Sequence, residues 1–216
     1  MRITEVEFGS LLAYSPSGNT VDAEQSRTLV NWLKTDHVFN RNPPILTSDW
    51  FAELVQKYLD SLPFRDYFNG KAVLVPTPGS GKKQSNGLWI ALRLADALFK
   101  RGLAREVRPC LERAIPVPKS ATSLAANRPK AERHFETMSV QKGFADLNEI
   151  VLIDDVITRG ATTLGAANRL IEAFPTARIR VFATVRTISS PSAFTGIAMP
   201  CVGKVELRGI DCYRRP

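Results

Sequence analysis

The stretch of sequence that decides the fold is Ile150-Val-Leu-Ile-Asp154-Asp155-Val-Ile-Thr158-Arg159-Gly160-Ala161-Thr162-Thr163. Its first four residues are all apolar, which is typical of a central strand in a parallel sheet because such a strand is buried on both faces. Two carboxylates and a Thr-Arg-Gly turn follow. The next segment predicts a helix, with apolar residues recurring on one face at Leu164, Ala167, Ile171 and Phe174.

The same alternation of strand and helix patterns extends on both sides of this stretch. Upstream, Ala72–Val75 predicts a buried strand that ends at Pro76, and Arg108–Ala114 predicts another. Between them the pattern predicts a helix with Leu88, Leu92, Ala95 and Phe99 on one face and Gly102 at its end. Downstream, Ile179–Val185 predicts the next strand. The fold class expected is α/β, a doubly wound parallel sheet that binds its ligand at the carboxyl ends of the strands.

The first seventy residues have a different pattern. They predict an early strand over Glu5–Tyr14 and helices over Ala23–Lys34 and Trp50–Leu62. We therefore expect two parts, an N-terminal hood-like appendage over residues 1–70 and the core over residues 71–216.

Composition bounds the function without deciding it. The formal net charge of +8 suggests an anionic partner, which could be a phosphorylated metabolite or a nucleic acid. Cys110, Cys201 and Cys212 are scattered and odd in number, which argues against a disulfide framework and a zinc site. The sequence has no apolar run long enough to cross a bilayer, and acids stand near Met1 where a signal peptide needs its apolar run. The expected location is the cytoplasm, with no membrane partner.

The residues after the strand form a pattern suited to a ribose phosphate. Asp154 and Asp155 are acceptors for sugar hydroxyls or for a hydrated divalent cation. The helix that starts near Gly160 offers free backbone N–H groups and the positive end of its dipole to an anion. Hydroxyls at Thr158, Thr162 and Thr163 add further donors.

This segment resembles the motif of type I phosphoribosyltransferases that binds phosphoribosyl pyrophosphate (PRPP). The resemblance implies that Asp154 and Asp155 bind the ribose hydroxyls and face the positive charge that develops in catalysis, with Mg²⁺ as the cofactor held by them indirectly. It implies a loop around the 5′-phosphate formed by Thr158, Arg159, Gly160, Ala161, Thr162 and Thr163. Arg159 and Ala161 depart from the commonest form of the motif, in which Thr and Gly stand there.

Two branches of that family are most similar. Asp-Asp-Val followed by Thr and Gly-Ala-Thr resembles the competence-associated (ComF-like) phosphoribosyltransferases, as does Val75-Pro-Thr-Pro78 before the first core helix. The zinc-binding cysteines at the N-terminus of that family have no counterpart before Cys110. The Arg-Gly-x-Thr-Thr ending is similar to glutamine-dependent amidophosphoribosyltransferases, whose N-terminal catalytic cysteine is not found at Met1-Arg2.

Two other segments are assigned through the same resemblance. The pyrophosphate loop would comprise Thr77, Pro78, Gly79, Ser80, Gly81 and Lys82. This loop is no Walker motif, because Pro76 and Lys83 stand where that motif needs Gly and Ser or Thr. Residues 115–141 occupy the place of a mobile catalytic loop, with Arg133 as a candidate catalytic residue.

The function expected is transfer of phosphoribosyl from PRPP to a nitrogenous base or amine, with release of pyrophosphate. Two alternatives remain open on the same fold. One is a PRPP or nucleotide sensor without turnover, and the other is a competence-type factor associated with nucleic acid. A homodimer also remains open, and nucleic acid is the less favoured partner.

Overall fold

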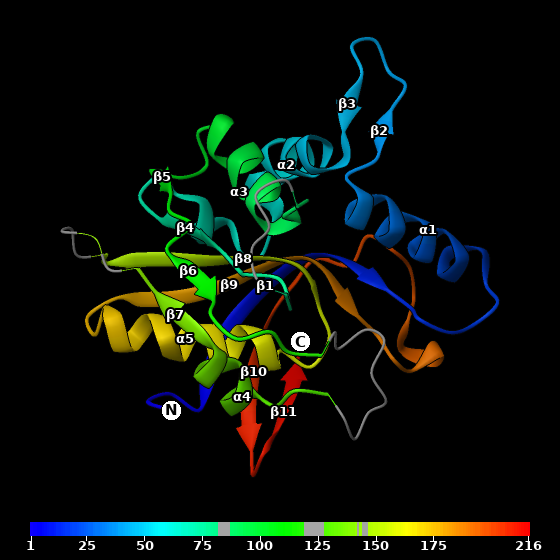
Figure 1. Cartoon of the computed structure of the whole chain (residues 1–216). Coiled ribbons are helices and arrows are strands. Elements are labelled where there is room, and N and C mark those ends of the chain that lie inside the picture. Colours follow the sequence, from blue (N-terminus) through cyan, green and yellow to red (C-terminus); the bar gives the residue numbers. More distant parts are fainter. Residues whose placement is uncertain (82–86, 119–127, 142, 144–146) are drawn as a thin grey trace.

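A seven-stranded sheet forms the centre of the computed structural model, which describes residues 1–81, 87–118, 128–141, 143 and 147–216 (Figure 1). Its strands are, in spatial order, β11 (Asp211–Arg215), β10 (Cys201–Arg208), β1 (Glu5–Tyr14), β9 (Arg178–Thr187), β8 (Glu149–Ile157), β4 (Val73–Pro76) and β5 (Glu106–Val107). The five strands from β1 to β5 in this order are parallel, and β10 and β11 add an antiparallel hairpin at one edge.

Helices cover both faces of the sheet (Figure 1). One face carries α1 (Val21–Thr35), α2 (Thr47–Tyr58), α3 (Ile90–Lys100) and the short helices η1 (Leu59–Ser61) and η2 (Arg65–Phe68). The other face carries α4 (Ala131–Thr137) and α5 (Ala161–Ala173). Smaller elements are the pairs β2 (Val38–Phe39) with β3 (Ile45–Leu46) and β6 (Leu111–Arg113) with β7 (Met138–Val140), and η4 (Pro191–Ala193). The α/β sheet flanked by helices is confirmed.

Strand β8 is buried and central, as its apolar sequence predicts. Ile150 to Ile153 are fully buried between β4 and β9. The strand is longer than expected, however, because pairing with β9 continues to Ile157 while pairing with β4 stops at Ile153. Asp154 and Asp155 therefore lie inside the strand, at the point where it extends beyond its neighbour.

Strand β1 lies inside the sheet, although it comes from the predicted N-terminal appendage. It pairs in parallel with β9 and antiparallel with β10. Its side chains contribute to both cores: Leu11 and Leu12 pack in the layer of α1 to α3, whereas Val6 and Phe8 pack in the layer of α5. The division of the chain at residue 70 stays a prediction, and the hood would consist of α1, α2 and the elements that join them.

Three predicted elements differ in detail. Helix α3 forms, but Leu88 and Phe99 are exposed, since its buried face runs through Ala91, Leu94, Ala95 and Leu98. The strand predicted over 108–114 is short and belongs to the separate β6–β7 pair. Part of the predicted loop over 115–141 is regular structure, namely α4 and β7; residues 119–127 of that loop lie outside the described residues. Within the described ranges, no helix combines the length and apolarity needed to span a membrane.

Gly165 lies where α4 approaches α5 closely. A Cβ there would lie 2.6 Å from the carbonyl oxygen of Ala131 and 2.9 Å from the backbone N of Phe135. Because backbone atoms cannot yield as a side chain can, any larger residue must push the two helices apart.

We expect Gly165→Ala to lower the free energy of unfolding by about 1–3 kcal/mol, the range for overpacked cores. This loss should occur although Ala favours a helix interior over Gly by about 1 kcal/mol. Denaturant titration measures the change. Gly143→Ala is the control, because nothing lies within 4 Å of the added Cβ there. A Gly165→Ala variant as stable as the parent would contradict the close packing of these helices.

Candidate functional site

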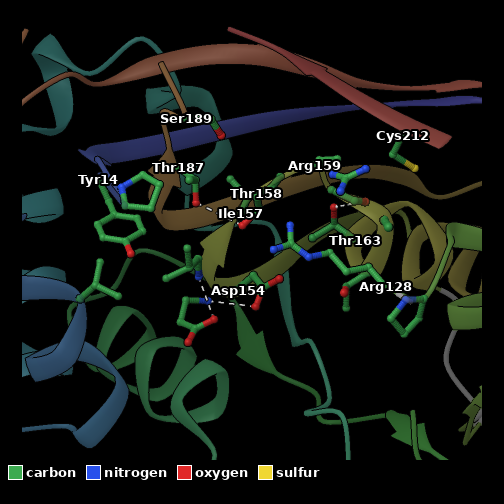
Figure 2. A pocket seen from close by; sticks show the side chains of 18 of the residues that line it. Tyr14, Arg128, Asp154, Ile157, Thr158, Arg159, Thr163, Thr187, Ser189 and Cys212 are labelled. Atoms are coloured by element: carbon green, nitrogen blue, oxygen red, sulfur yellow. Dashed lines mark hydrogen bonds between the residues drawn. The ribbon is translucent and has the colours of Figure 1, made fainter. Parts of the chain in front are cut away.

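A cavity of about 400 Å³ opens where β1, β8 and β9 end, between α1 and the start of α5 (Figure 2). It lies at the carboxyl edge of the parallel strands, where α/β sheets bind their ligands. The residues that line it are Tyr14, Pro16, Val30, Lys34, Arg128, Pro129, Lys130, Asp154 to Thr163, Thr187, Ser189, Asp211 and Cys212. Every residue of the segment predicted to bind a ribose phosphate therefore lines one cavity.

The two carboxylates occupy the middle of this cavity. Asp154 Oδ1 accepts a hydrogen bond from the backbone N of Asp155 at 3.0 Å, and Asp155 Oδ1 accepts one from the N of Val156 at 2.7 Å. These local bonds turn both side chains along the strand edge. Burial raises the pKa of Asp154 well above its ordinary value, and the neighbouring charge of Asp155 raises it further. A bound sugar hydroxyl or cation would relieve this repulsion.

The loop after β8 leads into α5, and no side chain caps the N-terminus of this helix. Gly160 adopts a left-handed φ of 84° and precedes α5, whose first turn has no side-chain cap and no acidic residue. A Cβ at Gly160 would come within 2.4 Å of Val205 on β10, so the close approach of the hairpin also requires glycine. Thr163 donates its hydroxyl to the carbonyl of Gly160 at 2.9 Å. The first N–H groups of α5 thus face the cavity, where they can bind an anion.

One arginine contacts this loop, and a second arginine lies near the first. Arg214 Nε donates to the carbonyl of Thr158 at 2.8 Å, and its terminal nitrogen donates to the carbonyl of Thr187. Arg186 is buried and donates to Ser10 Oγ and to the carbonyl of Met199. Burial and, to a lesser extent, the charge of Arg186 lower the pKa of Arg214 to about 10. This accumulation of positive charge favours a negative ligand over the loop.

The C-terminal hairpin also contributes residues that no sequence pattern had indicated. Asp211 and Cys212 line the cavity, and Asp211 forms ion pairs with Lys130 and, at 3.9 Å, with Arg159. The hydrogen bond from Lys130 lowers the pKa of Asp211. Burial raises the pKa of the Cys212 thiol to about 11, so the thiol stays protonated at neutral pH. No motif in the last sixteen residues marks them as part of a site.

The part of the cavity formed by the end of β1 and by α1 carries few charged side chains. Tyr14, Pro16 and Val30 form a largely apolar wall, with Lys34 and Ser189 as the polar groups. In Figure 2 the Tyr14 ring lies on one side of Asp154, and the Arg128 and Arg159 side chains lie on the other.

The predicted pyrophosphate loop starts beside the acids. Thr77 donates its backbone N and its hydroxyl to the carbonyl of Ile153, at 2.9 and 3.0 Å. Trp89 Nε1 donates to the carbonyl of Thr77 at 2.7 Å. Of the described part of this loop, Thr77 to Gly81, no residue lines the cavity, and Lys82 lies outside the described residues. Its role stays a prediction.

Arg133 lies apart from these groups. It is exposed on α4, pairs with Glu136 at 3.4 Å, and does not line the cavity. Its neighbour His134 is buried instead, with Nδ1 3.2 Å from an Arg113 terminal nitrogen and Nε2 3.3 Å from Thr162 Oγ1. The catalytic assignment of Arg133 stays a prediction. His134, unlike Arg133, contacts a residue that lines the cavity, namely Thr162.

The carboxylate pair fits a magnesium ion that is only partly held by protein. Among the described residues, no group of three or more acidic, histidine or cysteine side chains could enclose a metal. Mg²⁺ commonly binds to one or two carboxylates while phosphate oxygens and waters complete its shell. Asp154 and Asp155 offer that donor set, directly or through water.

The raised pKa of Asp154 makes stability depend on pH in a definite direction. Above about pH 3.9 the unfolded chain releases the proton of this carboxyl, whereas the folded protein binds that proton more strongly because its pKa is raised. The folded state is therefore penalised increasingly as pH rises from that value. We expect Asp154→Asn to raise the melting temperature at pH 7 by roughly 2–4 °C, or about 1 kcal/mol for this size.

Calorimetric melting at several pH values measures this gain, which should shrink toward pH 4. Asp60→Asn, at an exposed position, is the control. A loss of stability in Asp154→Asn at neutral pH would show that the carboxylate stabilises the ligand-free protein.

No protein-family model matches the chain, and no curated protein matches it either.

Proposed function

We propose that the protein is a phosphoribosyltransferase that transfers phosphoribosyl from PRPP to a nitrogenous acceptor and releases pyrophosphate. The observation that supports this best is the pairing of Asp154 and Asp155 with the uncapped start of α5 in one cavity. A sugar phosphate needs acceptors for its hydroxyls and donors for its phosphate at a short, fixed separation. Both sets lie within one continuous segment of chain here.

The residues have distinct roles in this proposal. Thr158, Thr162 and the first N–H groups of α5 bind the 5′-phosphate, and Asp154 and Asp155 bind the ribose hydroxyls. Mg²⁺ neutralises the diphosphate when bound. As the bond to pyrophosphate breaks, the anomeric carbon gains positive charge, which the carboxylates stabilise electrostatically. Burial strengthens that interaction, because fewer water dipoles compete with it.

The acceptor would lie at the end lined by Tyr14, Pro16 and Val30. An aromatic ring and apolar side chains suit a flat base. Lys34 and Ser189 are the polar groups at this end and would contact ring substituents. This placement puts the nucleophile across the carboxylate pair from the phosphate.

The first test of this proposal is ligand binding. We expect PRPP with Mg²⁺ to bind in the range of about 1 μM to 1 mM that is usual for metabolites. Changing both Asp154 and Asp155 to Asn should abolish most of this binding without unfolding the protein. Isothermal titration calorimetry measures the affinity, and unchanged binding in the double variant would exclude this site.

Mass spectrometry then decides between transfer and sensing. Wild-type protein is incubated with PRPP, Mg²⁺ and a library of bases and amines, and phosphoribosylated products are sought. A product whose formation requires both carboxylates supports the transferase. Tight PRPP binding with no product across the library would favour the sensor instead.

The basic residues separate a metabolite ligand from a polymer. Arg128 and Lys130 line the cavity, whereas Arg133 lies outside it. We expect Arg128→Ala and Lys130→Ala to weaken PRPP binding by roughly tenfold each, the usual cost of a charged hydrogen bond. Arg133→Ala should have a smaller effect.

Duplex DNA provides the opposite outcome. Binding to DNA should stay weak and non-specific in all variants. The contrary outcome is tight DNA binding whose salt dependence flattens, by about one unit of slope per lost phosphate contact, when Arg128, Lys130 and Arg133 are all replaced by Ala. That result would show that the protein binds a polymer backbone.

A further inference from the structure

A buried pair of side chains lies directly behind the phosphate loop. His134 on α4 is 3% exposed, and Arg113 on β6 is 4% exposed. Neither lines the cavity. Arg113 nevertheless reaches the pyrophosphate loop, since its Nε donates to the carbonyl of Gly79 at 3.1 Å. His134 reaches the phosphate loop, since its Nε2 lies 3.3 Å from Thr162 Oγ1.

The chemistry of arginine fixes where the protons of this chain lie. A guanidinium has only N–H donors and no acceptor. Its contact at 3.2 Å with Nδ1 of His134 therefore requires a lone pair on that nitrogen. The one proton of the neutral imidazole must then be on Nε2. Nε2 donates to Thr162 Oγ1, so Thr162 is the acceptor in that bond.

The Thr162 hydroxyl proton is thereby left for a ligand. No second partner for this hydroxyl lies within reach among the residues that the structure describes. The side chain lines the cavity at the first turn of α5, where an anion is favoured. The other two threonine hydroxyls of the loop already have protein partners. Thr163 donates to the carbonyl of Gly160, and Thr158 shares a hydrogen bond with Thr187 at 3.1 Å.

We propose that Arg113 and His134 are positioning residues that hold the Thr162 hydroxyl as a hydrogen-bond donor to a phosphate monoester. This inference rests on the proposed phosphate site but not on transfer of the phosphoribosyl group. Arg113 also joins the two loops, because one guanidinium contacts Gly79, Thr137 and His134. A displacement of the loop at Gly79 would therefore shift Thr162 through Arg113 and His134.

The surroundings keep this arrangement in one protonation state. Arg113 has no carboxylate partner within the described ranges. Burial and the charge of Arg113 lower the pKa of His134 to about 4, so the imidazole is neutral at physiological pH. A protonated Nδ1 would face the Arg113 donor and break the chain of hydrogen bonds.

A purely architectural pair would predict different behaviour. Arg113 also donates to Thr137 Oγ1 at 2.7 Å, and this bond secures the end of α4. If packing were the only role, every replacement of His134 would reduce affinity only as far as it reduces stability. Positioning predicts instead that the effect depends on which imidazole nitrogen the replacement imitates.

The first experiment reads the proton directly. The chain contains two histidines, His37 and His134, so long-range ¹H–¹⁵N correlation spectra of the wild type can be assigned with His37→Asn. At neutral pH we expect the His134 signals of a neutral ring with the proton on Nε2. A proton on Nδ1, or a doubly protonated ring, would overturn the proposal without any variant of His134.

The second experiment uses ribose 5-phosphate, which carries the phosphate monoester without pyrophosphate. A Gln side chain can place its amide donor near the position of Nε2, whereas an Asn side chain is shorter and reaches only the position of Nδ1, where its oxygen can accept from Arg113. We expect His134→Asn and Thr162→Val each to weaken binding roughly tenfold or more, as for a hydrogen bond to a charged group. His134→Gln should retain most of the affinity, and His37→Asn all of it.

A double-mutant cycle completes the test. His134→Asn should have little further effect once Thr162→Val has removed the hydroxyl. Additive losses of affinity in the double variant would show that Arg113 and His134 serve packing alone. Equal losses in the Asn and Gln variants of His134, at matched melting temperatures, would show the same. Failure of transfer with this coupling intact would overturn only the transferase, whereas transfer with no coupling would overturn only this inference.

Discussion

Two adjacent carboxylates on a buried strand repel each other, and the surrounding edge of the sheet is arranged around that repulsion. Asp154 and Asp155 lie where β8 continues past β4, so that one side of the strand is open while the other still pairs with β9. Ile150 to Ile153 pack too tightly to let the strand shift and move the acids toward water. The raised pKa of Asp154 reflects this cost. A site held in such a state gains when a ligand brings hydroxyl donors or a cation, because binding then relieves strain that folding imposed.

The positive half of the site comes from distant parts of the chain. The start of α5 supplies oriented N–H groups, and Arg214 from the last strand supports the loop that leads into it. Asp211 pairs with Lys130 from the segment before α4. These contacts join three regions whose separation in sequence is large, so the loop geometry depends on the completed sheet. The hairpin of β10 and β11 therefore belongs to the site, and the lack of a side chain at Gly160 lets Val205 of β10 approach the loop.

The sequence predicted the parts of this structure that depend on local pattern. The apolar run of β8, the helix after Gly160 and strand β9 follow from residue order alone, and all lie as expected. Position within the sheet could not be predicted for β1, because pairing with β9 and β10 is decided by tertiary contacts. The role of Asp211 could not be predicted either, since one acid in a short terminal strand has no distinguishing pattern. Asp36, directly after α1, accepts the backbone N–H of Ser48 in the first turn of α2 at 2.9 Å, and no local sequence pattern predicts this contact between two helices.

The net charge of +8 has a partial explanation inside the protein. Three arginines are each at most 5% exposed, namely Arg113, Arg180 and Arg186. They therefore cannot contact a nucleic acid that binds to the protein surface. Arg180 forms ion pairs with Asp66 and Glu149 at the opposite edge of the sheet. Arg113 and Arg186 instead lie near the phosphate loop, where a buried charge acts through a low dielectric and at short range. A long-range field would draw a nucleic acid to an exposed face, whereas these interior charges favour a small anion that enters the cavity. These buried arginines are out of reach of a nucleic-acid backbone and fit the small phosphorylated ligand of the proposed function.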